Sequence, residues 1–295
     1  MRRISFICIW VSVILLTGIL AACSGTAAPD VLTTSTILAD ITKNVAGDRL
    51  TVGSLVPIGV DPHSYQPTPQ DTAKVSKSKV LVVNGAEYEL FLEPLLASAD
   101  GEGTLIEAAT SLNLRSDAEH GTDPHLWLDP NNVIVYVENI RDGLIQFDPE
   151  GAEVYQANAS AYITQLEELD AWINGQIAEI PPPRRLLVTN HEAFGYFAER
   201  YGFTVVGTVI ESFSSDASPS AQQMAALVDQ INLYEAPAIF LDAADNPSLA
   251  QQIAAETNVK VVTDLHLESL TDGAPAGTYI EMMKYNVTKI VEAIQ

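Results

Sequence analysis

Hydrophobic residues follow two alternating patterns along most of the chain. Short runs rich in Val, Ile and Leu alternate with longer stretches in which apolar residues recur every three or four positions. The first pattern is typical of buried strands and the second of amphipathic helices, and their alternation is typical of parallel α/β units. The first half therefore predicts strands at 31–35, 51–56 and 79–84, with helices at 37–46, 69–78, 88–98 and 131–146. The second half predicts strands at 185–189, 204–209, 238–242 and 260–264, with helices at 193–201, 221–233, 248–257 and 279–294.

The segment between the two halves has a helical pattern of unusual length. Asp148 can cap a helix whose first position is Pro149, and the run Pro181-Pro182-Pro183 would end it. A single helix of about 30 residues would span roughly 45 Å. The alternative is two shorter helices broken near Gly175. One long helix linking two lobes would limit their relative motion to small rotations.

These patterns predict an α/β fold of two lobes, each with a mainly parallel sheet flanked by helices, joined by one long rigid helix. We divide the chain into an N-terminal lobe at 30–147, a linking helix at 148–183 and a C-terminal lobe at 184–295. About 266 residues follow Asp30, a length that suits two domains of ordinary size.

The N-terminus has the pattern of an export signal. Arg2 and Arg3 precede an apolar run at 4–22, which ends in Leu-Ala-Ala directly before Cys23. We interpret 1–22 as a lipoprotein-type signal peptide, Cys23 as the lipid-modified residue that attaches the chain to the membrane, and 23–29 as a tether. The alternative is an uncleaved membrane anchor, because about 19 apolar residues are just enough to span a bilayer. Both interpretations place the protein outside the cytoplasm, on the outer face of the cell membrane or in the periplasm.

Composition restricts the chemistry. The only cysteines are Cys8, inside the signal, and Cys23, so the mature chain has neither a disulfide nor a thiolate metal ligand. Loss of residues 1–22 removes two basic residues and no acidic one, which leaves a net charge of about −25. Such a surface repels nucleic acid and concentrates cations. A metal site would have to use His, Asp or Glu.

Three of the five histidines lie where parallel sheets bind ligands. His63 follows the strand predicted at 51–56, and His191 follows the strand that ends at Thr189. His125 precedes a helix in a second copy of the Asp-Pro-His triplet that contains His63. Ligands gather at the carboxyl ends of parallel strands, and imidazole and carboxylate suit divalent transition metals. Each histidine alone is more often a surface or hydrogen-bonded residue; the three together make a metal site a hypothesis.

Four longer motifs carry a family resemblance. They are Gly-Val-Asp-Pro-His-Ser-Tyr-Gln-Pro-Thr-Pro at 59–69, Asp-Pro-His-Leu-Trp-Leu-Asp-Pro at 123–130, His-Glu-Ala-Phe-Gly-Tyr-Phe at 191–197 and Met-Met-Lys-Tyr-Asn at 282–286. With them the chain resembles, from Thr34 to Ile294, the metal-specific solute-binding lipoproteins of ABC transporters, the family of ZnuA, TroA and PsaA. The resemblance implies a monomer that captures a metal ion and delivers it to an ABC permease, and it implies no enzyme activity.

The resemblance also implies four metal ligands, which are His63 and His125 from the first lobe and His191 and Asp264 from the second. This nitrogen-rich set favours zinc, with manganese or iron as the alternative. Zinc-type members often have a long His- and acid-rich loop before the second ligand, whereas residues 116–123 are short. His120 in this loop, together with Glu192 and His266, are candidate accessory residues.

Three other functions fit the sequence less well. A secreted zinc hydrolase would leave one metal position open for water, but the chain has no His-Glu-x-x-His or Gly-x-Ser-x-Gly motif. Its only candidate base beside a ligand is Glu192. An adhesin would be favoured by repeats or a wall anchor, and a siderophore- or corrinoid-binding protein by a broad apolar or cationic cleft.

Overall fold

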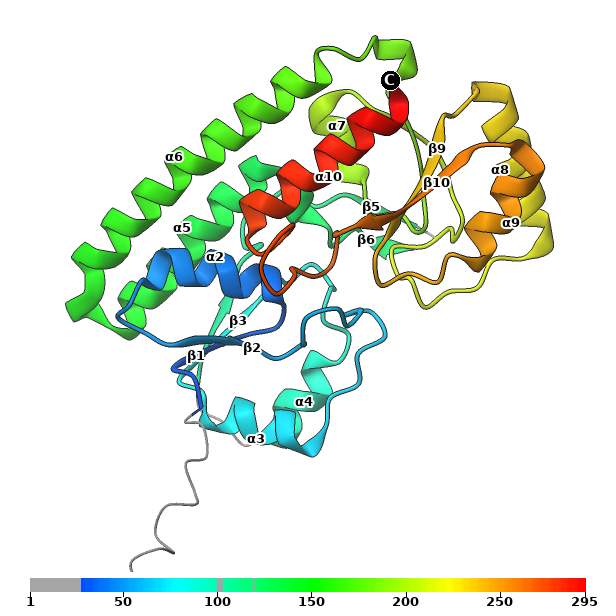
Figure 1. Cartoon of the computed structure of the whole chain (residues 1–295). Helices are drawn as coiled ribbons and strands as arrows, with labels where there is room; N and C mark the ends of the chain where they lie inside the picture. Colours follow the sequence, from blue (N-terminus) through cyan, green and yellow to red (C-terminus); the bar gives the residue numbers. More distant parts are fainter. Residues whose placement is uncertain (1–27, 100–102, 119) are drawn as a thin grey trace, which may run out of the picture.

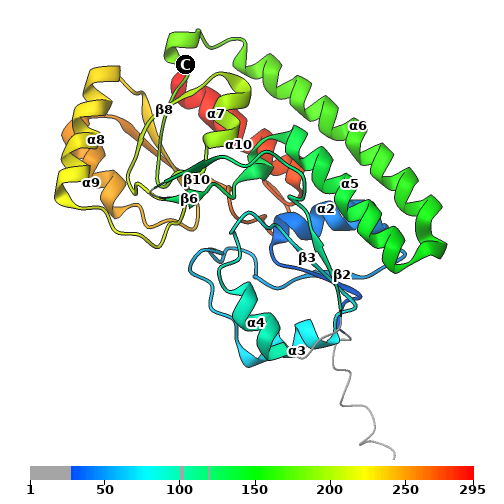
Figure 2. The same ribbon diagram turned by 180° about the vertical axis from the view of Figure 1, so that it is seen from behind.

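The computed structural model describes residues 28–99, 103–118 and 120–295 (Figures 1 and 2). The predicted signal peptide, Cys23 and most of the tether lie outside these residues. In the described part of the chain, no helix combines the length and the hydropathy needed to cross a membrane.

The first lobe is built on a parallel sheet in the order β2-β1-β3-β4. Along β1 and β3, side chains alternate between two faces. Val31, Val80 and Val82 join the core under α2 and α5, whereas Leu32 and Leu81 join a separate cluster under α3 and α4. The bounds are β1 Val31–Thr33, β2 Val52–Ser54, β3 Val80–Val83, β4 Thr104–Glu107, α2 Thr36–Ala46, α3 Pro69–Lys77, α4 Leu92–Ala99 and α5 Pro130–Phe147.

The second lobe repeats this construction with a parallel sheet in the order β10-β9-β7-β8. In β9, Ile239 and Leu241 pack under α8 and α9, while Phe240 joins the core on the other face. The bounds are β7 Leu186–Thr189, β8 Thr204–Thr208, β9 Ala238–Asp242, β10 Lys260–Leu265, α7 Gly195–Tyr201, α8 Ala221–Tyr234, α9 Ser248–Thr257 and α10 Tyr279–Ile294. A short hairpin, β5 Ser116–Asp117 and β6 Gly121–Thr122, lies between β4 and α5 in the sequence of the first lobe.

One long helix, α6 (Ala152–Ile177), runs along a side of the molecule that both views show (Figures 1 and 2). It starts three residues after Pro149 because Pro149–Gly151 form a 3-10 turn. It continues through Gly175, so the alternative of two shorter helices is wrong. It packs against α5 and α2 of the first lobe and against α10, which returns from the second lobe.

The two lobes share their largest hydrophobic core. It contains Val31 and Leu38 of the first lobe, Leu166 of α6, and Phe240 and Tyr279 of the second lobe. The predicted fold class, two α/β lobes with mainly parallel sheets and a long linking helix, is confirmed. The carboxyl ends of strands in both sheets lead into loops that meet between the lobes, where the candidate site lies.

Candidate metal-binding site

Three loops bring three imidazole rings together. His63 lies in the loop after β2, His191 lies two residues after β7, and His125 directly precedes the 3-10 turn Leu126–Leu128. The Nε2 atom of His125 is 3.3 Å from that of His63 and 3.3 Å from that of His191. His125 and His191 are 0% and 2% exposed, so these nitrogens face one another in the interior rather than in solvent.

A carboxylate completes this cluster. The Oε1 atom of Glu268 lies 3.2 Å from Nε2 of His125, 3.4 Å from that of His191 and 3.7 Å from that of His63. Glu268 is 4% exposed, and its Oε1 accepts no hydrogen bond of normal geometry from the described residues. A buried carboxylate oxygen without a donor is costly unless a positive charge neutralises it. A cation between these four atoms would satisfy all of them.

The structure places Asp264, the expected fourth ligand, outside this cluster. Asp264 lies within β10, with a side chain that is 47% exposed. Its Oδ2 accepts a 2.7 Å hydrogen bond from the Tyr285 hydroxyl and lies 2.7 Å from the Lys289 Nζ. The side chain thus faces α10 at the surface, and the loop after β10 supplies Glu268 four residues later.

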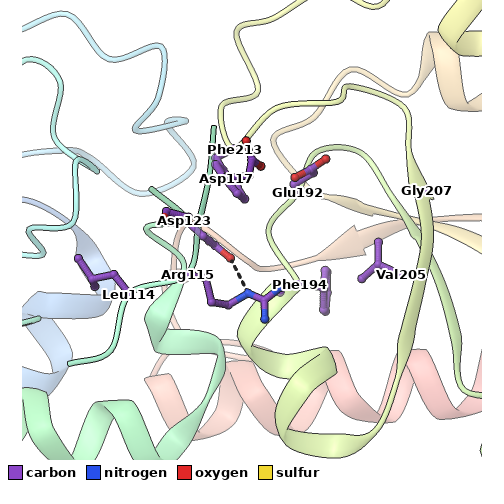
Figure 3. A pocket seen from close by; sticks show the side chains of 11 residues that line it. Leu114, Arg115, Asp117, Asp123, Glu192, Phe194, Val205, Gly207 and Phe213 are labelled. Carbon is purple, nitrogen blue, oxygen red and sulfur yellow. Dashed lines mark ion pairs between the residues drawn. The ribbon is translucent and has the colours of Figure 1, made fainter. Parts of the chain in front are cut away.

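The candidate accessory residues divide between two other places. His120 and Glu192 form a second, more exposed group with Asp117, and the His120 Nδ1 lies 3.1 Å from the Asp117 Oδ2. Asp117 and Glu192 line a cavity of about 610 Å³ (Figure 3), whose wall also includes Asp123, the hydrogen-bond partner of His125. His266 lies elsewhere, with its ring 5.5 Å from that of Tyr285. None of the three joins the described cluster of His63, His125, His191 and Glu268.

His125 is held by a buried carboxylate. Oδ1 of Asp123 accepts a 2.9 Å hydrogen bond from the ring Nδ1 of His125 and a 3.0 Å bond from its backbone N–H. The Oδ2 of Asp123 lies 3.7 Å from the Arg115 Nε, and Figure 3 marks this ion pair at the wall of the cavity. In the neutral form of His125, the hydrogen bond to Asp123 keeps the proton on Nδ1 and leaves the lone pair of Nε2 directed at the cluster.

The Glu268 loop is held from both lobes. Asp242, at the end of β9, accepts hydrogen bonds from the backbone N–H groups of Leu267 and Glu268 at 2.5 and 3.3 Å. From the first lobe, the Trp127 indole donates to the Leu267 carbonyl at 2.8 Å, and the Tyr88 hydroxyl donates to the Glu268 Oε2 at 3.0 Å. Glu268 of the second lobe is therefore positioned in part by side chains of the first lobe.

The charges of the cluster are coupled. Burial opposes ionisation of Glu268, but the adjacent His125 holds the pKa of this carboxyl well below its usual range. Burial would also lower the pKa of His125, but Glu268 and Asp123 outweigh it and raise this pKa to about 9. For His191, Glu268 is the only described carboxylate that opposes burial, and burial lowers the pKa of this ring. At neutral pH the metal-free cluster therefore contains an anionic Glu268 beside a protonated His125 and a neutral His191.

The two lobes, the long helix and the buried cluster define a class, the two-lobed binding proteins for metal ions. A family model described as zinc-uptake complex component A, periplasmic (ZnuA), matches residues 31–293, and the chain belongs to this family. It is a metal-binding component of an ABC transporter and not an enzyme.

Named relatives differ in the metal that their names state. The chain is 37% identical over 265 residues to the manganese-binding lipoprotein MntA of Halalkalibacterium halodurans, covering 90% of this chain and 88% of MntA. It is 33% identical over 266 residues to the iron-binding protein YfeA of Yersinia pestis, covering 89% and 85%. The solved structure of the periplasmic zinc-binding protein TroA from Treponema pallidum superposes with a TM-score of 0.84 at 28% identity, covering 90% and 99%.

Proposed function

We propose that the protein captures a divalent transition-metal ion, zinc in preference, through His63, His125, His191 and Glu268, and delivers it to an ABC permease. The observation that carries this proposal is the buried Glu268 Oε1 with three imidazole nitrogens 3.2–3.7 Å away. The four groups come from loops of both lobes. Occupancy by the ion would thus link the lobes, and the permease would have to separate them to take the ion.

The choice of zinc rests on the donor set. Three imidazole nitrogens and one carboxylate oxygen are the donors of compact tetrahedral zinc sites, whereas manganese favours more oxygen donors and higher coordination numbers. Manganese is the second candidate, because the similar MntA is named for manganese and one carboxylate with imidazoles accepts it. Iron, named for YfeA, is a further alternative.

The N-terminal sequence and the name of a relative support a proposal for the location. We propose that 1–22 is removed, that Cys23 carries the lipid, and that the domain works as a monomer at the outer face of the membrane. The name of MntA as a lipoprotein supports this. We also propose that the lobes meet the linking helix at 147/148 and 183/184. Mass spectrometry of the mature N-terminus tests the anchor: a mature chain that starts elsewhere, or a Cys23 without lipid, would contradict it.

The ligand set is tested by titrating the metal-free protein with Zn²⁺ and with Mn²⁺ in competition with a chelator of known affinity. Glu268→Gln and His125→Ala should each lower the affinity at least about tenfold, since the first replaces an anionic carboxylate by a neutral amide and the second removes an imidazole donor from a buried site. Asp264→Asn is the matched control, because Asp264 pairs with Lys289 at the surface, and it should bind as the wild type does. If Asp264→Asn weakens binding and Glu268→Gln does not, the proposed ligand set is wrong.

A further inference from the structure

The two oxygens of Glu268 have different surroundings. Oε1 faces the three imidazole nitrogens at 3.2–3.7 Å. Oε2 instead accepts a hydrogen bond of 3.0 Å from the Tyr88 hydroxyl of the opposite lobe. A carboxylate can bind a metal through one oxygen or through both, and here one oxygen is already engaged.

Tyr88 is fixed in this position. It is 3% exposed, and its ring packs edge-on against His63, with centroids 5.5 Å apart, and against Trp127 at 4.9 Å. Trp127 in turn bonds the Leu267 carbonyl next to Glu268. Burial raises the pKa of the Tyr88 hydroxyl well above its ordinary value, so it keeps the proton that it donates. Moving the Tyr88 hydroxyl away from the Glu268 Oε2 would leave this buried hydroxyl without a hydrogen-bond partner, which is unfavourable.

We infer that Tyr88 determines metal specificity: by engaging Oε2 it restricts Glu268 to one-oxygen coordination, which keeps the site at four donors and favours zinc over manganese. This inference rests on the ligand set proposed above. Zinc is satisfied by four tetrahedral donors. Manganese favours oxygen donors and a larger coordination number, so it would gain from the second carboxylate oxygen that Tyr88 withholds.

The test is Tyr88→Phe, which removes the hydroxyl and keeps the ring that packs on His63 and Trp127. The variant should shift the ratio of Zn²⁺ to Mn²⁺ affinity toward manganese by about tenfold. The loss of one hydrogen bond to a charged group has an effect of about this size. X-ray absorption at the metal edge should show Glu268 bound through one oxygen in the wild type and through two in the Mn²⁺ form of Tyr88→Phe.

Tyr279→Phe is the matched control. Its hydroxyl is also buried and donates to the Trp127 carbonyl at 2.7 Å, but this bond does not involve Glu268. The affinity ratio of this variant should equal that of the wild type. An unchanged ratio in Tyr88→Phe, or an equal loss of affinity for both metals, would overturn the inference, because the hydroxyl would then be only structural.

Failure of this inference is distinguishable from failure of the proposed function. If Glu268→Gln abolishes binding but Tyr88→Phe leaves the ratio unchanged, the ligand set stands and Tyr88 has no part in selection. If Glu268→Gln binds both metals as the wild type does, the ligand set itself is wrong.

Discussion

At the scale of single residues, Asp123 lies outside the proposed ligand set but positions one of its members, His125. It is 0% exposed and accepts hydrogen bonds from both the ring and the backbone of His125. In Asp123→Asn one carboxylate oxygen becomes an NH₂ group, which cannot accept from Nδ1. If it faces the ring it favours the tautomer with a proton on Nε2. Metal affinity should fall about 10- to 100-fold, the usual effect of losing a partner that orients a histidine ligand.

The measurement for Asp123→Asn is the same chelator competition, with Asp216→Asn as a control at an exposed carboxylate. The circular dichroism spectrum should not change, because the side chain supports one ring rather than a core. Wild-type affinity in Asp123→Asn would mean that His125 needs no partner to present its Nε2.

The raised pKa of His125 predicts how binding depends on pH. Below a pH of about 9, the His125 ring of the metal-free site carries a second proton. The metal ion must displace this proton in order to bind. Apparent affinity should therefore rise about tenfold per pH unit up to about pH 9 and then level off. His191, with a lowered pKa, is neutral at pH 8 and adds no proton. Calorimetry at pH 8 in buffers of different ionisation enthalpy should detect about one proton released per ion, and a value near zero would contradict this coupling.

The sequence allowed three of the four clustered residues to be predicted but not the fourth. His63, His125 and His191 are rare residues in loops next to strands, so their positions were informative. Asp264 was expected from the family resemblance and from its place at the end of the strand predicted at 260–264, but carboxylates are common in this chain, and the strand runs on to Leu265. The distinction between Asp264 and Glu268 depends on which side chain is buried, and burial is set by Tyr88 and Trp127 of the other lobe.

At the scale of secondary-structure elements, two helical glycines should respond in opposite ways to alanine. In α5, a Cβ on Gly143 would lie 2.5 Å from the Ile106 Cδ1 of β4. Overpacking of this kind costs about 1–3 kcal/mol, more than the gain of about 1 kcal/mol in helix propensity. Gly143→Ala should therefore lower the free energy of unfolding by about 1 kcal/mol, measured by urea denaturation.

Gly175 of α6 supplies the comparison. It is exposed, and no described atom lies within 4 Å of a Cβ built there. Gly175→Ala should raise the free energy of unfolding by up to about 1 kcal/mol. If both variants were destabilised, α6 would be less regular at its C-terminal end than the structure has it. If both were stabilised, Ile106 would have room to move away from α5.

Most elements were predictable because their apolar periodicity is long and regular, as in α5, α6 and α10. The helix expected at 88–98 begins instead at Leu92. Residues 85–89 form a turn in which Ala86 and Glu87 have positive φ angles, and the Glu89 carboxylate accepts from the backbone N–H groups of Asn84 and Gly85. This turn carries Tyr88 toward the site. Hydrophobic spacing contains no information about such a side-chain-to-backbone bond. The strand β4 was not predicted either, because its four residues do not form a long apolar run.

At the scale of the whole molecule, the described lobes are joined by more than α6. The largest core runs from α2 and α5 through α6 to α10, and the Glu268 loop is bonded to Thr36 and Trp127 of the first lobe through its neighbours Leu270 and Leu267. Separation of the lobes would expose part of this core and break these bonds. Metal capture should therefore involve small changes around the four ligand loops rather than a wide closure.

This shared core predicts that the protein unfolds in one cooperative thermal transition that the metal shifts as a whole. A ligand that binds only the folded state at 100 times its Kd adds about 2.7 kcal/mol. For a protein of this length that gain should raise Tm by roughly 5–10 °C. Scanning calorimetry with and without Zn²⁺ measures it, and His125→Ala should show a much smaller rise. Two separate transitions, of which only one moved with Zn²⁺, would mean that the lobes fold independently and that the metal is held by one of them.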